Sequence, residues 1–371
     1  MDPFSELTGF IRLQLCRTSL KQLLAIKAYF GSVESALEAP QSAWLHASIL
    51  SEKQLQHLFQ DGVETKVEEA LCWGEEENQC WIPWESDAYP PVLSEIDDPP
   101  ILLGARGHID MLKDPQLAVV GSRHASKQGA MIAEDFSAFL SSQGITITSG
   151  LAAGIDTHAH RGGLRGVGKT VAVVATGLDR VYPASNQPLA RKIAEQGVMI
   201  SEQPLGTKPL AQYFPQRNRI ISGLSLGTLV VEAALKSGSL ITARLALEQG
   251  KEVFAIPGSI YNPQAKGCHQ LIKQGAKLVE SADDILEELS SSLQMGMQAS
   301  IEYKAPRQSD HSYGEGAENK LLAFIDFEPV GLDELVVVTK KPVSELQSQL
   351  LILELSGRIE ALSGGRWRRI K

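Results

Sequence analysis

The stretch Leu117-Ala-Val-Val-Gly-Ser-Arg-His-Ala-Ser-Lys-Gln-Gly129 decides the fold. Its short apolar, β-branched run is followed by a glycine and then by Ser126, a residue type that often precedes the first turn of a helix. The pattern predicts a buried strand that leads into a helix. Similar apolar runs recur at residues 145–148, 170–174, 198–200, 228–231 and 252–256, and a shorter run at 277–279 predicts an edge strand.

Helical stretches separate most of these runs, and continuous apolar strands with helical crossovers indicate a parallel sheet covered on both faces. The predicted fold class is therefore α/β, with a Rossmann-like doubly wound parallel sheet in a domain spanning residues 76–289. We include in this domain the Trp- and Pro-rich stretch from Cys80 to Pro100, which we interpret as an extended connector.

Two smaller domains are predicted to flank the sheet. Residues 1–75 have the spacing of short amphipathic helices, one of which is expected to end at Gly31. Residues 290–316 lack periodicity and are interpreted as a linker. Residues 317–371 predict three short helices, near Leu321, near Leu332 and over 342–355, followed by a hairpin with Gly-Gly at its turn. This is the order of a winged-helix domain.

The composition is that of a chain with a sizeable core: 43% of the 371 residues are hydrophobic and 21% are charged. No apolar run reaches the roughly 18 residues of a membrane span, and the first residues lack the pattern of a secretory signal. The four cysteines show no C-x-x-C pairing and read as reduced thiols. We therefore expect a cytoplasmic protein. Its net charge of −9 does not exclude a local basic cleft that binds nucleic acid, because salt screens distant charges within about 10 Å.

The candidate ligand site lies in the loops that follow the strands, where doubly wound sheets bind their ligands. Gly121 permits a tight turn, and the helix after Ser126 would expose backbone N–H groups to an anion. Arg123 adds a guanidinium suited to phosphate oxygens. For this loop alone, a plain strand–helix turn explains the residues equally well. The run from Ser237 to Ser239 predicts a second cradle of the same kind.

Three cations, Lys208, Arg217 and Arg219, lie within residues 206–223, which contain no acid. Phe214 adds an aromatic ring. Cations along a backbone beside rings that stack on bases are typical of sequence-tolerant binding to single strands. Taken singly, Phe214 is more often a core residue and one arginine is more often an internal ion-pair partner.

The loop after residues 145–148 carries Asp156, His158 and His160. The two histidines are two positions apart and would point to different helix faces, so we predict no metal site. We interpret His160 as a structural hydrogen-bonding residue and Asp156 as a helix N-cap. No cofactor is predicted either, because the first turn is not G-x-G-x-x-G and the second strand ends without the acid that holds a ribose.

Six motifs follow one another along the chain: Val120-Gly-Ser-Arg123, Ser149-Gly-Leu-Ala-Ala-Gly-Ile-Asp156 with Ala159-His160, Gly177-Leu-Asp-Arg-Val-Tyr-Pro183, Phe214-Pro-Gln-Arg-Asn-Arg-Ile-Ile-Ser-Gly223, Ser237-Gly-Ser-Leu-Ile-Thr242 and Ala255-Ile-Pro-Gly258. In this order and spacing they resemble the DNA-processing protein A family (DprA, also called Smf). The resemblance covers about residues 80–290, and the flanking domains are similar to the sterile-alpha-motif-like (SAM-like) and winged-helix domains of the longer members.

The resemblance implies a homodimer that binds and protects incoming single-stranded DNA in natural transformation and loads the RecA recombinase onto it. It implies no catalysed reaction. Residues 183–186 read Pro-Ala-Ser-Asn where some relatives carry a lysine, so no phosphate contact is assigned there. The implied DNA-binding positions are Gly121, Ser122, Arg123, Lys208, Phe214, Arg217, Asn218, Arg219, Ser237, Gly238 and Ser239.

The first alternative is an enzyme. Related Rossmann-like proteins of the lysine-decarboxylase-like type cleave nucleoside monophosphates with an arginine and a glutamate beside a double-glycine loop. Arg219 and Glu232 offer such a pair, but Leu224-Ser-Leu226 stands where the double glycine would be. We expect Glu232 to pair with an arginine and hold the cleft open.

The second alternative is a transcription factor that reads duplex DNA through the winged helix. The presumed recognition helix, residues 343–355, carries Glu345 and Glu354 and no Lys or Arg. A helix in the major groove normally brings cations to phosphates and base edges. We therefore favour an accessory or protein-binding role for this domain.

Overall fold

A nine-stranded sheet, in the order β1-β2-β6-β5-β4-β3-β7-β8-β9, forms the centre of the protein. The computed structural model describes residues 3–290, 321–322, 324–325, 330–339, 341–355, 358–362 and 366–370. The strands of the large sheet are β1 (Gln79–Pro83), β2 (Leu102–Gly107), β3 (Gln116–Val120), β4 (Thr146–Ser149), β5 (Thr170–Val173), β6 (Val198–Ser201), β7 (Gly227–Val230), β8 (Glu252–Ala255) and β9 (Lys277–Leu278).

The predicted α/β class with a mostly parallel sheet is confirmed. Each strand from β3 to β9 pairs in parallel with its neighbours in that group, whereas β1–β2 and β2–β6 pair antiparallel. The chain runs from β3 through β4 and β5 to β6, and then returns to place β7 against the other side of β3. Ligands of such sheets bind where the strand order reverses, so the loops after β3 and β7 flank the expected site.

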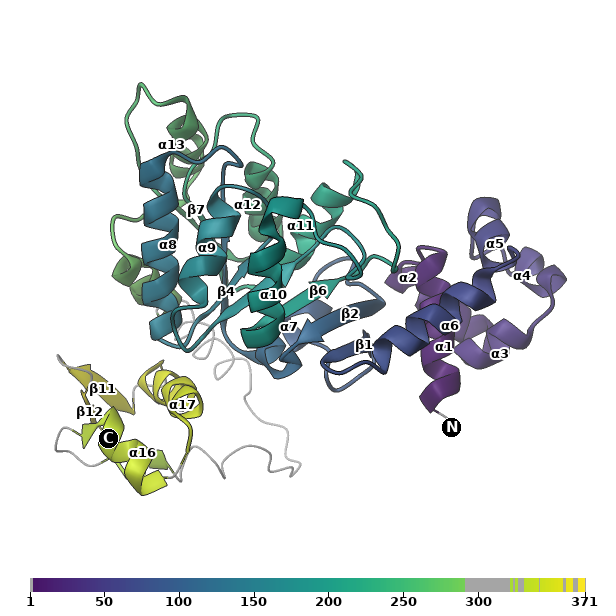
Figure 1. The fold of residues 1–371 in the computed structure, drawn as a ribbon, viewed down its shortest axis with the longest axis horizontal. Helices are drawn as coiled ribbons and strands as arrows, with labels where there is room; N and C mark the ends of the chain where they lie inside the picture. The colour runs from purple at the N-terminus through teal and green to yellow at the C-terminus, as the bar shows by residue number, and fades with distance from the viewer. Residues whose placement is uncertain are drawn as a thin grey trace, which may run out of the picture.

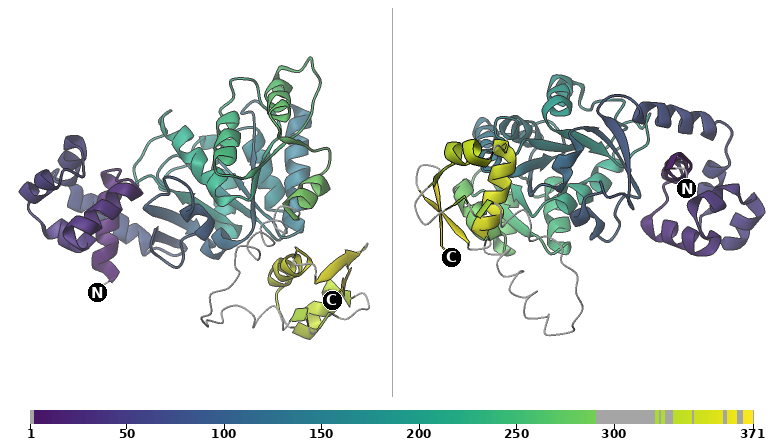
Figure 2. Two further views of the ribbon diagram at one scale, coloured as in Figure 1. Left: turned by 180° about the vertical axis from the view of Figure 1, so that it is seen from behind. Right: turned by 90° about the horizontal axis from the view of Figure 1, so that it is seen from below.

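Helices cover both faces of the sheet (Figures 1 and 2). Alternate residues of β3 face opposite layers: Leu117 and Val119 belong to one apolar cluster, and Ala118 and Val120 to another. One layer contains α8 (Lys127–Ser142), α9 (Ile155–Gly163), α10 (Gln187–Gln196) and a helix over residues 282–290, and the other contains α7 (Pro91–Ser94), α11 (Tyr213–Leu224), α12 (Ser239–Glu248) and α13 (Lys266–Lys273).

Six N-terminal helices lie beside the antiparallel edge of the sheet, which α1 and α6 contact (Figure 1). Their apolar residues form one continuous core with that edge: Phe10 lies in the same cluster as Trp81, Leu102 and Met199. Gly31 ends α2 in a left-handed conformation, as predicted. The helices are α1 (Pro3–Leu15), α2 (Leu20–Phe30), α3 (Val33–Glu38), α4 (Gln41–Ala47), α5 (Glu52–Leu58) and α6 (Val63–Gly74).

The Trp- and Pro-rich stretch differs from its prediction as an extended connector, because part of it is regular structure. Residues 79–83 form β1, which pairs with β2, and α7 follows. The indole N–H of Trp81 donates to the carbonyl oxygen of Ala70 at 2.7 Å, which ties β1 to α6. The stretch thus extends the sheet toward the N-terminal helices.

The C-terminal residues confirm the winged-helix prediction. The helices α16 (Leu332–Thr339) and α17 (Val343–Leu355) pack on a small sheet of β10 (Val330–Gly331), β12 (Arg366–Arg369) and β11 (Ile359–Leu362). The predicted linker, the Gly-Gly turn and most of the predicted helix near Leu321 lie outside the described residues. Among the described helices, none has both the length and the apolar character needed to cross a bilayer.

Candidate nucleic-acid interface

A cleft of about 720 Å³ lies beyond the carboxyl ends of the central strands. The loops after β3, β4, β5, β6 and β7 all contribute to its lining, which is the arrangement expected at the point where the strand order reverses. The predicted positions that line it are Gly121, Ser122, Arg123, Phe214, Arg217, Asn218, Ser237, Gly238 and Ser239. Lys208 and Arg219 are not among the lining residues.

Two glycines let the first two loops meet closely. A Cβ atom on Gly121 would lie 2.6 Å from Cγ1 of Ile155, and one on Gly154, whose φ is +80°, would lie 2.2 Å from the carbonyl oxygen of Ser122. The backbone N–H of Ser122 donates to the carbonyl oxygen of Glu232 at 2.7 Å. The loops after β3, β4 and β7 are therefore fixed to one another, which presents a preformed cleft wall.

The start of α8 is capped from two directions. The hydroxyl of Ser126 accepts a hydrogen bond from the backbone N–H of Gly129, as predicted for an N-cap residue. The carboxylate of Glu232 accepts from the backbone N–H and the hydroxyl of Ser126, at 2.9 and 2.6 Å. The expectation that Glu232 pairs with an arginine is wrong, because this carboxylate is already used by the cap.

Arg123 and Tyr182 are exposed in the cleft, and the ring of Phe214 between them is partly buried. The guanidinium of Arg123 lies over the ring of Phe214, 5.1 Å from its centre, and the ring of Tyr182 lies 5.8 Å from that of Phe214. Within residues 3–290, no carboxylate forms an ion pair with Arg123. Tyr182 was not predicted as a site residue, although it follows β5 and therefore had to reach this same edge of the sheet.

The run Ser237-Gly238-Ser239 opens α12, as predicted, and borders the cleft. The hydroxyls of Ser237 and Ser239 lie 2.7 Å apart. The side-chain amide of Asn218 donates to the carbonyl oxygen of Gly238 and so holds this run against α11. Lys236, which was not predicted, is exposed beside the run and also lines the cleft.

Arg217 lines the floor of the cleft but is only 4% exposed. Its guanidinium donates to the carbonyl oxygen of Gly150 at 2.6 Å and to that of Val173, and so joins the ends of β4 and β5. Burial lowers the pKa of Arg217 to about 10, so it is charged at neutral pH. These hydrogen bonds occupy the guanidinium with the protein backbone, and the predicted contact of Arg217 with a strand stays a prediction.

Asp156 is not the N-cap of α9, which is Gly154. Its carboxylate accepts hydrogen bonds from the backbone N–H groups of Gly150 and Ala152, at 3.1 and 3.3 Å. Burial raises the pKa of Asp156, and the neighbouring Arg217 opposes that rise. Asp156 and Arg217 together hold the loop after β4 in place beneath the cleft.

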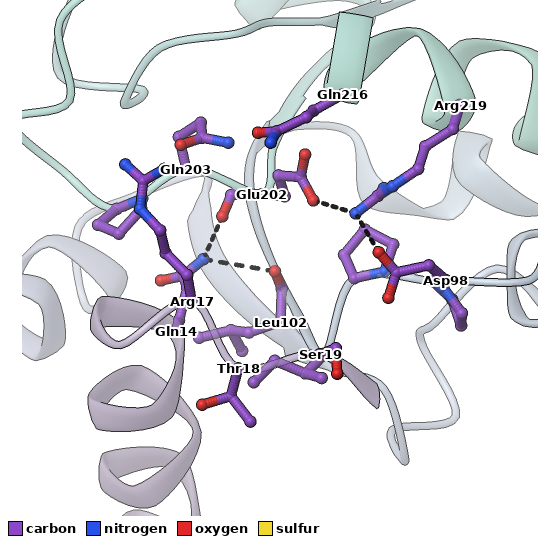
Figure 3. Close-up of a pocket in the computed structure, with 14 residues that line it drawn as sticks. Gln14, Arg17, Thr18, Ser19, Asp98, Leu102, Glu202, Gln203, Gln216 and Arg219 are labelled. Carbon is purple, nitrogen blue, oxygen red and sulfur yellow. Dashed lines mark hydrogen bonds and ion pairs between the residues drawn. The ribbon is translucent and has the colours of Figure 1, made fainter. Parts of the chain in front are cut away.

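Arg219 does not line the cleft, and its predicted contact with a strand stays a prediction. Its guanidinium pairs with Glu202 at 2.5 Å and with Asp98 at 3.7 Å, beside a second cavity of about 190 Å³ between the N-terminal helices and the sheet (Figure 3). The acid at position 202, directly after β6, was the available signal for this pairing. Lys208 is exposed on the loop that contributes Pro209 and Ala211 to the cleft.

This distribution also weighs against the nucleotide-cleaving alternative. An arginine and a glutamate would have to face one substrate, yet Glu232 caps α8 and Arg219 pairs with acids at a different cavity. The structure does not bring the two side chains to one site.

His160 is fully buried and makes two hydrogen bonds, as predicted for a structural residue. Its Nε2 accepts from the backbone N–H of Leu151 at 3.2 Å, so its Nδ1 carries the proton that it shares with the hydroxyl of Thr170 at 2.7 Å. Burial lowers the pKa of His160 to about 3. The folded protein therefore keeps this imidazole neutral.

We expect His160 to make the folded state less stable as the pH falls below about 6.5, where an unfolded histidine takes up a proton. Between pH 6.5 and about 3 the unfolded chain binds the additional proton, so stability falls by up to about 1.4 kcal/mol per pH unit. Urea denaturation at several pH values should show a shallower dependence for His160→Gln than for the wild type. Equal slopes would contradict a neutral, buried His160.

Two family models match parts of this chain. The family model described as DNA recombination-mediator protein A matches residues 80–290, and the model described as the DprA winged helix domain matches residues 304–365. Protein Smf of Escherichia coli is 46% identical over 301 residues, which cover 81% of this chain and 80% of that protein. The DNA processing protein DprA of Streptococcus pneumoniae is 52% identical over 202 residues, which cover 54% of this chain and 71% of that protein.

Two solved structures are also similar. The X-ray structure of DprA from Streptococcus pneumoniae superposes with a TM-score of 0.66 at 41% identity, covering 75% of this chain and 95% of that one. The structure of DNA processing protein A from Helicobacter pylori, whose description concerns its single-stranded DNA binding mode, gives a TM-score of 0.53 at 28% identity and covers 57% and 96%.

Proposed function

Since this chain belongs to the DNA recombination-mediator protein A family, we propose that it binds single-stranded DNA in the cleft beyond β3 to β7 and delivers the strand to the RecA recombinase. The observation that carries the proposal is the cleft itself, where the cation of Arg123 has no carboxylate partner within residues 3–290 and lies over the partly buried ring of Phe214, next to the exposed ring of Tyr182. A phosphate of the strand would bind this cation, and a base would stack on an aromatic ring.

The set of residues that we propose to contact the strand is smaller than the set predicted from the sequence. Arg123 and Lys236 would neutralise phosphates, and the backbone N–H groups at the start of α12 would hold a further one. Phe214 and Tyr182 would stack on bases. Lys208 would reach the strand from the loop before α11, whereas Arg217, Arg219 and Asn218 would act from within the protein.

Binding of fluorescent oligonucleotides at several salt concentrations tests the proposal. We expect single strands to bind more tightly than duplexes of the same sequence and far more tightly than single nucleotides, because several adjacent phosphates are needed to fill the cleft. The affinity should fall as salt rises, with a slope of about −0.7 per neutralised phosphate. Equal affinity for duplex and single strands would contradict this function.

Replacing Phe214 with alanine should cost roughly 1–3 kcal/mol of single-strand binding, because a stacked base loses its aromatic partner. The ring is only partly buried, so the midpoint of thermal unfolding should change little. Phe214→Tyr is the matched control and should bind as the wild type does. A large loss of thermal stability with normal binding would show that the ring belongs to the core.

We further propose that the protein works in the cytoplasm as a homodimer during natural transformation, and that it catalyses no reaction. The family description as a recombination mediator and the names of its relatives support this proposal. The dimer is tested by light scattering, which should give twice the chain mass. Delivery to RecA is tested by the lag before RecA hydrolyses ATP on a strand covered by single-strand-binding protein, which the chain should shorten.

A further inference from the structure

The segment of residues 202–213, which runs from the end of β6 to the first residue of α11, is held at both ends by the N-terminal helices. At its start, the side-chain amide of Gln14 donates to the carbonyl oxygen of Glu202 at 2.9 Å (Figure 3). At its end, the guanidinium of Arg17 donates to the hydroxyl of Tyr213 and lies 4.5 Å from the centre of that ring. Tyr213 itself is 3% exposed.

Tyr213 and Phe214 begin α11 and point about 100° apart around the helix axis. Phe214, Arg217 and Asn218 line the cleft, at the spacing of one helix face. Gln216 and Arg219 lie three and six residues after Tyr213 and line the cavity beside the N-terminal helices. Because Tyr213 and Phe214 share one rigid turn of helix, a contact that fixes the first ring also fixes the direction of the second.

The backbone of Arg17 supports a role for its side chain. Its φ is +56°, a left-handed conformation that is strained for a non-glycine residue and that glycine adopts freely. The backbone N–H of Arg17 donates to the carbonyl oxygen of Gln14, and the carbonyl oxygen of Arg17 accepts from the side-chain amide of Gln54. A position shaped for glycine therefore holds an arginine, and its guanidinium contacts Tyr213.

We propose that Arg17 is a positioning residue, through which the N-terminal helices orient the ring of Phe214 in the cleft. The proposal rests on the proposed single-strand binding and deepens it. Arg17 touches no base or phosphate in this account; it acts through Tyr213 on the neighbouring ring. The N-terminal helices thereby contribute to strand affinity from outside the cleft.

The decisive variant is Arg17→Gly, which removes the side chain and at the same time relieves the backbone. The variant should therefore unfold at nearly the same temperature as the wild type. Its affinity for a base-bearing strand should fall about three- to tenfold, a part of the value of one stacked base. Its affinity for a strand with abasic residues should stay the same, and so should the salt slope, because no phosphate contact is lost.

Three further proteins make the test specific. Lys21→Ala removes an exposed positive charge from α2 in the same domain and should leave both affinities unchanged. Arg17→Lys keeps a cation and a donor and should restore part of the loss. In the Phe214→Ala background, Arg17→Gly should have no additional effect, because the ring through which it acts is gone.

Equal losses for base-bearing and abasic strands, no loss at all, or losses that add to those of Phe214→Ala would each overturn the proposal. Strand binding by Arg123→Ala is measured in parallel, so that a failure of the proposed function can be told apart from a failure of the positioning role of Arg17. If Arg123→Ala weakens binding and Arg17→Gly does not, only the positioning role fails. If the wild type binds no single strand, the proposed function fails and the positioning role fails with it.

Discussion

Arg123→Ala should weaken single-strand binding by about tenfold to a hundredfold, the value of one charge-assisted hydrogen bond of about 1.5–3 kcal/mol. Arg123 is exposed and, within residues 3–290, forms no ion pair with a carboxylate, so its removal breaks no salt bridge and the midpoint of unfolding should change little. Loss of one phosphate contact should also reduce the salt slope by about 0.7. Fluorescence anisotropy at four or more salt concentrations measures both quantities.

The matched control for this experiment is Arg191→Ala. Arg191 is an exposed arginine on α10 that does not line the cleft, so its loss changes the net charge by the same amount. We expect its affinity and salt slope to equal those of the wild type. If both arginine variants weakened binding equally, general electrostatic attraction would explain the result, and the cleft assignment would be wrong.

Arg217→Met should produce the largest loss of stability, roughly 3 kcal/mol. The substitution leaves the carbonyl oxygens of Gly150 and Val173 without their donor and leaves the buried Asp156 without its neighbouring cation. Breaking a buried, hydrogen-bonded charge arrangement typically costs about 3–5 kcal/mol, and the methionine side chain recovers part of the packing. The midpoint of urea denaturation measures the change.

The double variant with Asp156→Asn serves as the control for Arg217→Met. It removes the uncompensated acid, so it should be more stable than Arg217→Met alone while remaining less stable than the wild type. A fully stable Arg217→Met protein with much weaker strand binding would contradict the structural role and would restore the contact that the sequence first predicted.

The sequence predicted the sheet well because its strands are short, β-branched and buried on both faces. All the predicted apolar runs became strands, including the edge strand at residues 277–278. The strand β2 was missed because Leu102-Leu-Gly-Ala-Arg-Gly107 holds two glycines and an arginine, and it becomes a strand by pairing with β1 and β6. Pairing of that kind depends on tertiary structure, which local preference does not contain.

The cations of α11 show where site prediction stopped. Arg217 and Arg219 look alike in the sequence, but two positions along a helix turn a side chain by about 200°, so the two guanidinium groups point to different surroundings. Arg217 donates to backbone carbonyl oxygens beneath the cleft, and Arg219 pairs with the carboxylate of Glu202. Arg123 does line the cleft, because a residue in the loop directly after a strand lies at the ligand-binding edge of the sheet.

The core shared by the N-terminal helices and the sheet has a consequence for how this chain can be dissected. A fragment that starts at residue 76 would expose to water the side of Trp81, Leu102 and Met199 that now packs against the helices. Such a fragment should aggregate or lose its antiparallel edge, whatever its affinity for DNA. The N-terminal helices are thus part of the core that stabilises the sheet. Exchanging them for those of a relative would require exchanging the strands that they contact as well.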